Sequence, residues 1–208
     1  MKSLFESTQD VLFSKDIEQK TQGTQKLKQD FEEGKLNHEK AFPIKDLVEA
    51  GYPSFLNFVA PKDLPRRRLG SPLGKVALLH SLAHIEFNAI NLALDAVYRF
   101  QQMPSLYYAD WLRVAADEAR HFQLLQGRLI QLDSAYGEFP VHSGLWEMAE
   151  NTAHDVLVRM ALVPRVMEAR GLDVTPGMVS KLREIKDSES AQILQLIWEE
   201  EIQHVSIG

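Results

Sequence analysis

From Ser71 to the end of the chain, apolar residues recur every three or four positions, which is the period of an amphipathic helix. Ser71 and Pro72 predict a helix start, because serine caps a helix N-terminus and proline fits its first turn. Breaks at Pro104 and at the loop 136–140 separate the segments that follow. We predict helices over residues 71–101, 104–133, 143–170 and 188–208. The pattern therefore predicts an all-α fold for this part of the chain.

The third of these helices is expected to end at Gly171, because glycine favours the C-terminal end of a helix. Thr175 and Pro176 then predict a restart, so that 171–176 is a break inside one long helical leg. Residues 186–188 predict the hairpin turn into the last helix. That helix continues only four residues past His204, so we interpret it as truncated at the C-terminus.

The first 70 residues have a different pattern. Residues 2–13 predict a short amphipathic helix, and the polar residues 15–40 predict a solvated helix or loop. Between 42 and 72 the prolines are too dense for a long helix, while aromatic residues among them require something to pack against. We therefore expect an N-terminal helix and extended arm over 1–70, packed on a helical bundle formed by 71–208.

Composition narrows the function classes. The chain has no cysteine, which excludes disulfides, thiolate metal sites and iron–sulfur clusters. Its net charge of −6 argues against a nucleic-acid partner. The N-terminus lacks the apolar run of a signal peptide, and no stretch approaches the roughly 20 apolar residues of a membrane span. We expect a cytoplasmic protein without a membrane partner.

Four glutamates interrupt the apolar stripes of the predicted helices. They are Glu86, Glu118, Glu168 and Glu201. A carboxylate on a core-facing stripe is costly unless it is paired or bound to a metal ion. Two of the four have a histidine three residues later, namely His121 and His204, and that spacing directs both side chains to one place. Carboxylate and imidazole together suit iron, manganese or zinc.

The spacing of the glutamates predicts a single layer. Glu86 and Glu118 lie 32 residues apart, and Glu168 and Glu201 lie 33 apart. In antiparallel hairpins with turns near Met103 and Lys186, the members of each pair come to about the same height. The order Glu, Glu-x-x-His, Glu, Glu-x-x-His is the pattern of dinuclear carboxylate bundles. Four carboxylates would also balance two divalent cations.

Three stretches carry a resemblance to the ferritin-like superfamily, over about residues 65–208, and most of all to a bacterial ferritin-like family of unknown function. They are His80-Ser-Leu-Ala-His84-Ile-Glu86, Asp117-Glu118-Ala-Arg120-His121-Phe122 and Glu200-Glu201-Ile-Gln-His204-Val. The resemblance implies a ferritin-like four-helix bundle whose metal ligands are Glu86, Glu118, His121, Glu168, Glu201 and His204. The second stretch is also similar to a motif of di-iron mono-oxygenases, in which the residue before the glutamate steadies a histidine ligand. Asp117 and Glu200 occupy that place, although Glu200 departs from the usual aspartate.

These observations lead to one leading hypothesis. The chain binds two iron ions, or alternatively manganese, and reduces dioxygen or peroxide while oxidising an unknown small-molecule or macromolecular substrate. The alternatives are iron binding or storage without catalysis, a di-manganese catalase-like activity and a metal-free interaction module. We identify no catalytic residue beyond the metal centre. The oligomeric state stays open, with a homodimer among the options.

Other residues that could carry chemistry have simpler explanations. His80 and His84 do not share the stripe of Glu86, so we expect them to cap, pack or support the ligands from outside. Tyr98 and Tyr108 could be redox-active, but core or interface packing explains them more simply. Glu168 lacks a paired histidine and lies near the expected break, so a solvated position near a helix end is its alternative.

Overall fold

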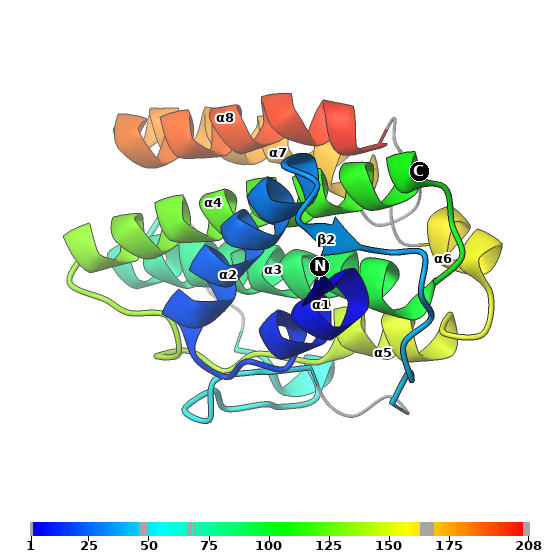
Figure 1. Cartoon of the computed structure of the whole chain (residues 1–208). Coiled ribbons are helices and arrows are strands. Elements are labelled where there is room, and N and C mark those ends of the chain that lie inside the picture. The colour runs from blue at the N-terminus through cyan, green and yellow to red at the C-terminus, as the bar shows by residue number, and fades with distance from the viewer. Residues whose placement is uncertain (1, 46–49, 66–67, 69, 163–168, 206–208) are drawn as a thin grey trace.

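The computed structural model describes residues 2–45, 50–65, 68, 70–162 and 169–205, and in this part of the chain it is predominantly helical (Figure 1). Two long helices, α3 (Pro72–Arg99) and α4 (Ser105–Gln131), pack along each other at the centre. Two further helices, α7 (Ala169–Glu184) and α8 (Ser188–Val205), form a hairpin that lies along α4. The all-α prediction is confirmed.

The limits of α3 and α4 follow from local chemistry. The Ser71 hydroxyl accepts a hydrogen bond from the Gly74 amide at 3.0 Å, which caps α3 as the sequence predicted. Pro104 lies directly before α4. The hairpin turn at 186–188 is also confirmed, because Lys186 takes a positive φ of 60° between α7 and α8. Both faces of α3 and the inner face of α4 bury apolar side chains, which form the main core.

The N-terminal region contributes two helices and a short strand pair. Helix α1 (Leu4–Leu12) packs on α3, and α2 (Ile17–Glu32) packs on α4. Strands β1 (Lys2–Ser3) and β2 (Leu36–Asn37) pair in parallel. The helix predicted within 2–13 is confirmed. The solvated element predicted over 15–40 is mainly helical, and one side of α2 is buried.

In the described residues between β2 and α3, the chain forms an arm without long helices, and its one 3₁₀ turn is Pro61–Asp63. The arm is held against the loop that follows α4, because Phe58 forms an isolated bridge with Val141. None of the described helices has the length and apolar character needed to cross a lipid bilayer.

The single helix predicted over 143–170 is wrong. The structure has α5 (Gly144–Asn151) and α6 (Val156–Leu162), separated by a turn. The Thr152 hydroxyl donates to the Met148 carbonyl at 2.7 Å, and Asp155 accepts from the amides of Leu157 and Val158 at the start of α6. Side chains of this kind compete with the backbone for hydrogen bonds, so they end one helix and cap the next.

The predicted break at 171–176 is also wrong, because α7 continues through both Gly171 and Pro176. Proline has no amide hydrogen, so the carbonyl four residues earlier, that of Leu172, loses its helical partner. The indole Nε1 of Trp198 in α8 donates to this carbonyl at 3.0 Å. Tertiary contact therefore supplies the hydrogen bond that the helix cannot make.

Candidate metal centre

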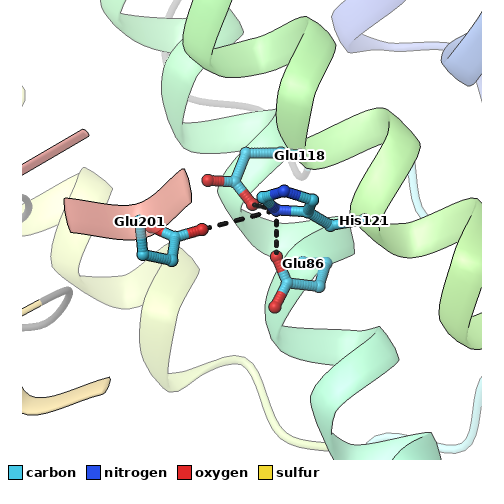
Figure 2. A group of neighbouring side chains, drawn as sticks. All are labelled: Glu86, Glu118, His121 and Glu201. Carbon is cyan, nitrogen blue, oxygen red and sulfur yellow. Dashed lines mark ion pairs between the residues drawn. The ribbon is translucent and has the colours of Figure 1, made fainter. Parts of the chain in front are cut away.

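A cluster of carboxylate and imidazole groups lies where α3, α4 and α8 meet (Figure 2). Glu86 comes from the middle of α3, Glu118 and His121 from the middle of α4, and Glu201 from the last turns of α8. Each offers one ligand atom, and these atoms all lie within 4.8 Å of one another. Three residues of the cluster are buried, and Glu201 is partly buried. This grouping could hold a metal ion.

The Nδ1 atom of His121 lies at the centre of the cluster. It is 3.5 Å from Glu86 Oε2, 3.6 Å from Glu118 Oε2 and 3.4 Å from Glu201 Oε1 (Figure 2). The Glu-x-x-His spacing of α4 explains why Glu118 and His121 share one side of the helix. The turn between α7 and α8 brings Glu201 to the same height from a distant part of the sequence.

His204 joins the cluster from α8. Its Nδ1 lies 3.1 Å from Glu118 Oε1 and 3.1 Å from Glu201 Oε2, and its side chain is only 3% exposed. The carboxylate of Glu118 therefore lies between the imidazoles of His121 and His204. The structure thus brings together five of the six residues predicted as metal ligands. The sixth, Glu168, lies outside the described residues.

Two further carboxylates hold the histidine rings from outside, and each comes from the opposite helix. His121 Nε2 lies 2.7 Å from Glu200 Oε2, and His204 Nε2 lies 3.3 Å from Asp117 Oδ2. An ionised carboxylate only accepts hydrogen bonds, so each Nε2 carries a hydrogen. In the neutral imidazole Nδ1 then keeps its lone pair and directs it into the cluster, as metal ligation requires.

Arg120 links these two outer carboxylates. Its guanidinium contacts Glu200 and lies 3.5 Å from Asp117. Burial acts against ionisation, but His204 and Arg120 hold the pKa of Asp117 below its usual value. Glu200 is affected in the same way, since His121 and Arg120 lower its pKa against the effect of burial. Both groups therefore stay acceptors for the histidine rings.

Two atoms of the cluster are buried without a hydrogen-bond partner. They are Glu118 Oε2 and His121 Nδ1. A buried polar atom of this kind costs free energy unless a ligand or ion satisfies it. An oxygen and a nitrogen that face the same space are a donor set suited to a divalent cation. The residues present therefore fit a metal ion.

Without a metal ion, protons must neutralise the clustered charges. Burial, together with the neighbouring Glu118, raises the pKa of Glu86 well above its usual value. Burial opposes protonation of the histidines, yet the carboxylates around them raise the pKa of His121 strongly and that of His204 to about 12. The same imidazoles keep the pKa of Glu118 well below its usual value despite its burial. Metal ions entering this site would displace these protons.

The two histidines set apart in the sequence analysis pack elsewhere. His80 Nε2 accepts from the Gly137 amide at 2.8 Å, and His84 contacts Tyr136 and the His142 carbonyl. Tyr98 and Tyr108 are fully buried, with their hydroxyls bonded to backbone groups.

Arg120 was not among the residues predicted for the site. Two signals pointed to it: its place in the stretch Asp117-Glu118-Ala-Arg120-His121-Phe122 and its position three residues after Asp117 on the same helix.

Fold and site together define an all-α protein with a buried carboxylate–histidine cluster between three of its helices. The chain belongs to the family described as "Protein of unknown function (DUF455)", which it matches over residues 13–208. It is similar to an uncharacterized protein of Haemophilus influenzae, with 49% identity over 175 residues. That alignment covers 81% of this chain and 57% of the relative, so the chain spans less than two thirds of the relative's length. No solved structure matches the chain.

Proposed function

We propose that this chain is a ferritin-like four-helix bundle that binds a dinuclear metal centre, with iron as the preferred metal. The observation that carries the proposal is the inward-facing donor set. Ligand atoms of Glu86, Glu118, His121 and Glu201 lie within 4.8 Å of one another, and two buried atoms among them have no hydrogen-bond partner. Buried polar atoms without partners cost free energy, and a bound cation would offset that cost.

The donor count supports two ions rather than one. Glu118 lies between two imidazoles, so Glu118, His121 and His204 would together offer donors for a pair of ions. Glu86 and Glu201 then add carboxylates to the pair. Glu168 is the proposed fourth carboxylate, from the sequence pattern, and four carboxylates neutralise two divalent ions.

Oxygen and nitrogen donors without a thiolate suit iron or manganese. We propose an oxidoreductase that uses dioxygen or peroxide on a substrate still to be identified. Two features favour chemistry over simple structural binding. Glu86, Glu118, His121 and His204 are buried, which would limit the access of water to bound metal, and the outer pair Asp117 and Glu200 contacts the histidine rings. Iron binding or storage without catalysis, and manganese-dependent disproportionation of peroxide, are the alternatives.

The first experiment is metal reconstitution of the full chain. Protein stripped of metal should take up two ferrous ions per chain under anaerobic conditions. Exposure to dioxygen should then produce near-ultraviolet absorption from oxygen bound to ferric iron. Glu118→Gln should abolish the uptake. The matched control is Glu189→Gln, in which a glutamate at the exposed start of α8 is changed.

The outcomes separate the alternatives. Anomalous diffraction across the iron and manganese edges identifies the metal. Manganese with peroxide disproportionation selects the catalase-like function, and iron retained in a hollow shell of many subunits selects storage. Uptake of no more than trace metal, unchanged by Glu118→Gln, would contradict the whole proposal.

A further inference from the structure

A buried ionic anchor fixes the start of α8 to α3 and α4. The carboxylate of Asp187, which is 4% exposed, lies 2.8 Å from Lys75 Nζ of α3 and 2.8 Å from Arg128 Nη2 of α4. It also accepts hydrogen bonds from the amide and the hydroxyl of Ser190, in the first turn of α8. Arg128 Nε donates to the same hydroxyl at 2.9 Å. Breaking a buried pair leaves a charge without a counter-ion, so this end of α8 has little freedom.

Apolar packing fixes only the first half of α8. Its buried apolar residues are Ala191, Leu194 and Ile197. Past Ile197, no residue of α8 whose side chain the structure describes is both apolar and buried. The indole of Trp198 donates to the Leu172 carbonyl of α7 at 3.0 Å. The second half of α8 is therefore joined to its partner in the hairpin.

The last turns of α8 meet α4 through polar and charged groups, and we call this contact the polar seam. Glu200 contacts Arg120 and lies 2.7 Å from His121 Nε2, and His204 Nδ1 lies 3.1 Å from Glu118 Oε1. The side chains of Glu200 and Arg120 are 30% and 38% exposed, so water reaches the seam. Partly exposed ion pairs exchange with water at little cost, unlike buried ones. This end of α8 can therefore separate from α4 more easily than the anchored end.

The inward atoms of the metal cluster cannot be reached from solvent without movement. Glu118 Oε2 and His121 Nδ1 are buried, and Glu86 is 6% exposed. The most exposed member of the cluster is Glu201 of α8, with 17% of its side chain exposed. An entering ion therefore meets the cluster first at α8, and separation of this helix at the polar seam would uncover the remaining donors.

We propose that α7 and α8 form a hinged arm, which is fixed at the Asp187 anchor and opens at the polar seam to admit metal ions to the cluster. Neither helix needs to unfold, because Trp198 joins α8 to α7 while the anchor holds the turn between them. Hinges of this kind lie at the ends of elements and leave the elements intact. An ion held by groups of α3, α4 and α8 would keep the arm closed, and this closing step rests on the proposed function.

The test is dipolar electron paramagnetic resonance of the full chain, which has no native cysteine to interfere with spin labelling. One label pair spans the polar seam, at Arg113→Cys and Glu199→Cys. Another spans the anchored end, at Gly127→Cys and Gln192→Cys, and all four positions are exposed. In metal-free protein we expect an additional population at longer distance across the seam and a single population at the anchored end. Asp187→Asn should add the longer population at the anchored end.

Zinc is the metal used as a probe, because it is redox-inactive and binds carboxylate and imidazole groups. Added zinc should remove the longer population across the seam, and Glu118→Gln should prevent this change. A third label pair, Asp173→Cys and Glu199→Cys, lies within the arm and should give one unchanged distance. If this pair broadens together with the seam, α8 unwinds by itself and the arm is refuted.

The remaining outcomes separate the hinge from the metal proposal. A single population at both ends of the metal-free protein overturns the hinged arm. If zinc binds and the longer population persists, the closing step is wrong. If the seam opens but equilibrium dialysis detects no zinc uptake, the hinge is supported and the proposed metal function fails instead. An anchored end that is unchanged in Asp187→Asn would show that Asp187 is not the anchor.

Discussion

The two sides of α3 are both polar and both buried, but they differ in how their polar atoms are satisfied. One side carries Glu86 toward α4 and α8. The other carries a stripe at helical spacing, which we call the polar stripe: His80, His84, Asn88, Asn91 and Asp95. Apart from Asn91 Nδ2, the buried polar atoms of the stripe have partners among the described protein groups, whereas the cluster around Glu86 contains two converging buried atoms that have none.

Partners of the polar stripe come from four segments that surround α3. The loop after α4 forms hydrogen bonds with His80 and His84, and the Tyr52 hydroxyl of the arm donates to Asn88. Lys20 of α2 donates to Asn91 Oδ1, and Arg159 of α6 pairs with Asp95. We compared the fully buried polar atoms of these five described side chains. Among them, only Asn91 Nδ2 has no hydrogen-bond partner. The stripe therefore attaches the surrounding segments to α3.

The contrast teaches that a buried polar residue is not by itself evidence of a binding site. Buried polar residues are tolerated when other parts of the protein supply hydrogen-bond partners. The hydrogen bonds of the polar stripe therefore account for its burial. Buried polar groups that converge without protein partners require a bound ligand or ion. The two sides should therefore respond differently to mutation, one through stability and the other through metal binding.

The largest effect on stability should come from Asp95→Asn in the polar stripe. Asp95 Oδ2 lies 2.7 Å from Arg159 Nη1, and both side chains are almost fully buried. Removing the negative charge leaves the arginine buried without a counter-ion, which typically costs about 3–5 kcal/mol of unfolding free energy. Guanidinium denaturation measures the loss.

Asp110→Asn is the control, because its pair with Arg113 is exposed and should change stability by about 1 kcal/mol at most. Metal stoichiometry should be unchanged in the folded fraction of both variants. Equal unfolding free energies of the two variants would show that the buried pair stabilises the protein no more than the exposed pair.

A smaller effect is expected from metal removal, on the other side of α3. Metal that binds only the folded protein should stabilise it by about 2.7 kcal/mol at a free concentration 100 times the dissociation constant. Thermal unfolding with and without ferrous iron under anaerobic conditions measures this increment. Glu118→Gln should eliminate the increment, because its Oε2 is one of the unpartnered atoms. An increment that survives in this variant would place the metal elsewhere.

Much of the cluster could be predicted from sequence because its members follow helical periodicity. Glu118 and His121 share a face by their spacing, and the hairpin at Lys186 brings Glu201 to the same height. These relations need only the geometry of a helix and the position of one turn. That the cluster binds metal stays a prediction, as does the role of Glu168.

The errors in the fold arise where the hydrogen bonds of particular side chains, distant in one case and local in the other, decide whether a helix continues. The sequence of α7 contains two residues that usually end helices, yet the helix continues because Trp198 of α8 satisfies the carbonyl left free by Pro176. The interruption between α5 and α6 depends on which backbone groups Thr152 and Asp155 bind. Helical periodicity contains neither kind of information. The partners of the polar stripe were unpredictable for the same reason.

Glu200→Gln should weaken metal binding without removing a ligand. Glu200 accepts from Nε2 of His121 at 2.7 Å and contacts Arg120. Glutamine keeps an acceptor oxygen but removes the negative charge that strengthens both contacts, so the imidazole ring is held less firmly. Changes of this kind typically reduce metal affinity by about 10–100-fold. Competition with a coloured chelator measures the affinity, and Glu199→Gln, a change at the exposed neighbour on α8, is the control. Identical affinities for the two variants would contradict the role of the outer carboxylate.

The smallest expected effect concerns Lys20, which donates a hydrogen bond to Asn91 of the polar stripe and makes stability depend on pH. Lys20 Nζ donates to Asn91 Oδ1 at 2.7 Å and to the Leu12 carbonyl at 2.6 Å, and the side chain is fully buried. Burial lowers the pKa of Lys20 from 10.5 to about 7. Between these values the unfolded chain binds the proton and the folded chain releases it, so this residue makes stability rise as the pH rises.

This contribution can reach about 1.4 kcal/mol per pH unit above pH 7, and it should disappear in Lys20→Met. The measurement is the free energy of unfolding in guanidinium at pH 7, 8 and 9. Lys26→Met on the same helix is the control, because its side chain is 71% exposed and should leave the pH slope unchanged. A slope in Lys20→Met equal to that of the unmodified protein would mean that Lys20 keeps its proton in the fold. The polar stripe would then hold an uncompensated charge and would no longer differ from the cluster on the other side of α3.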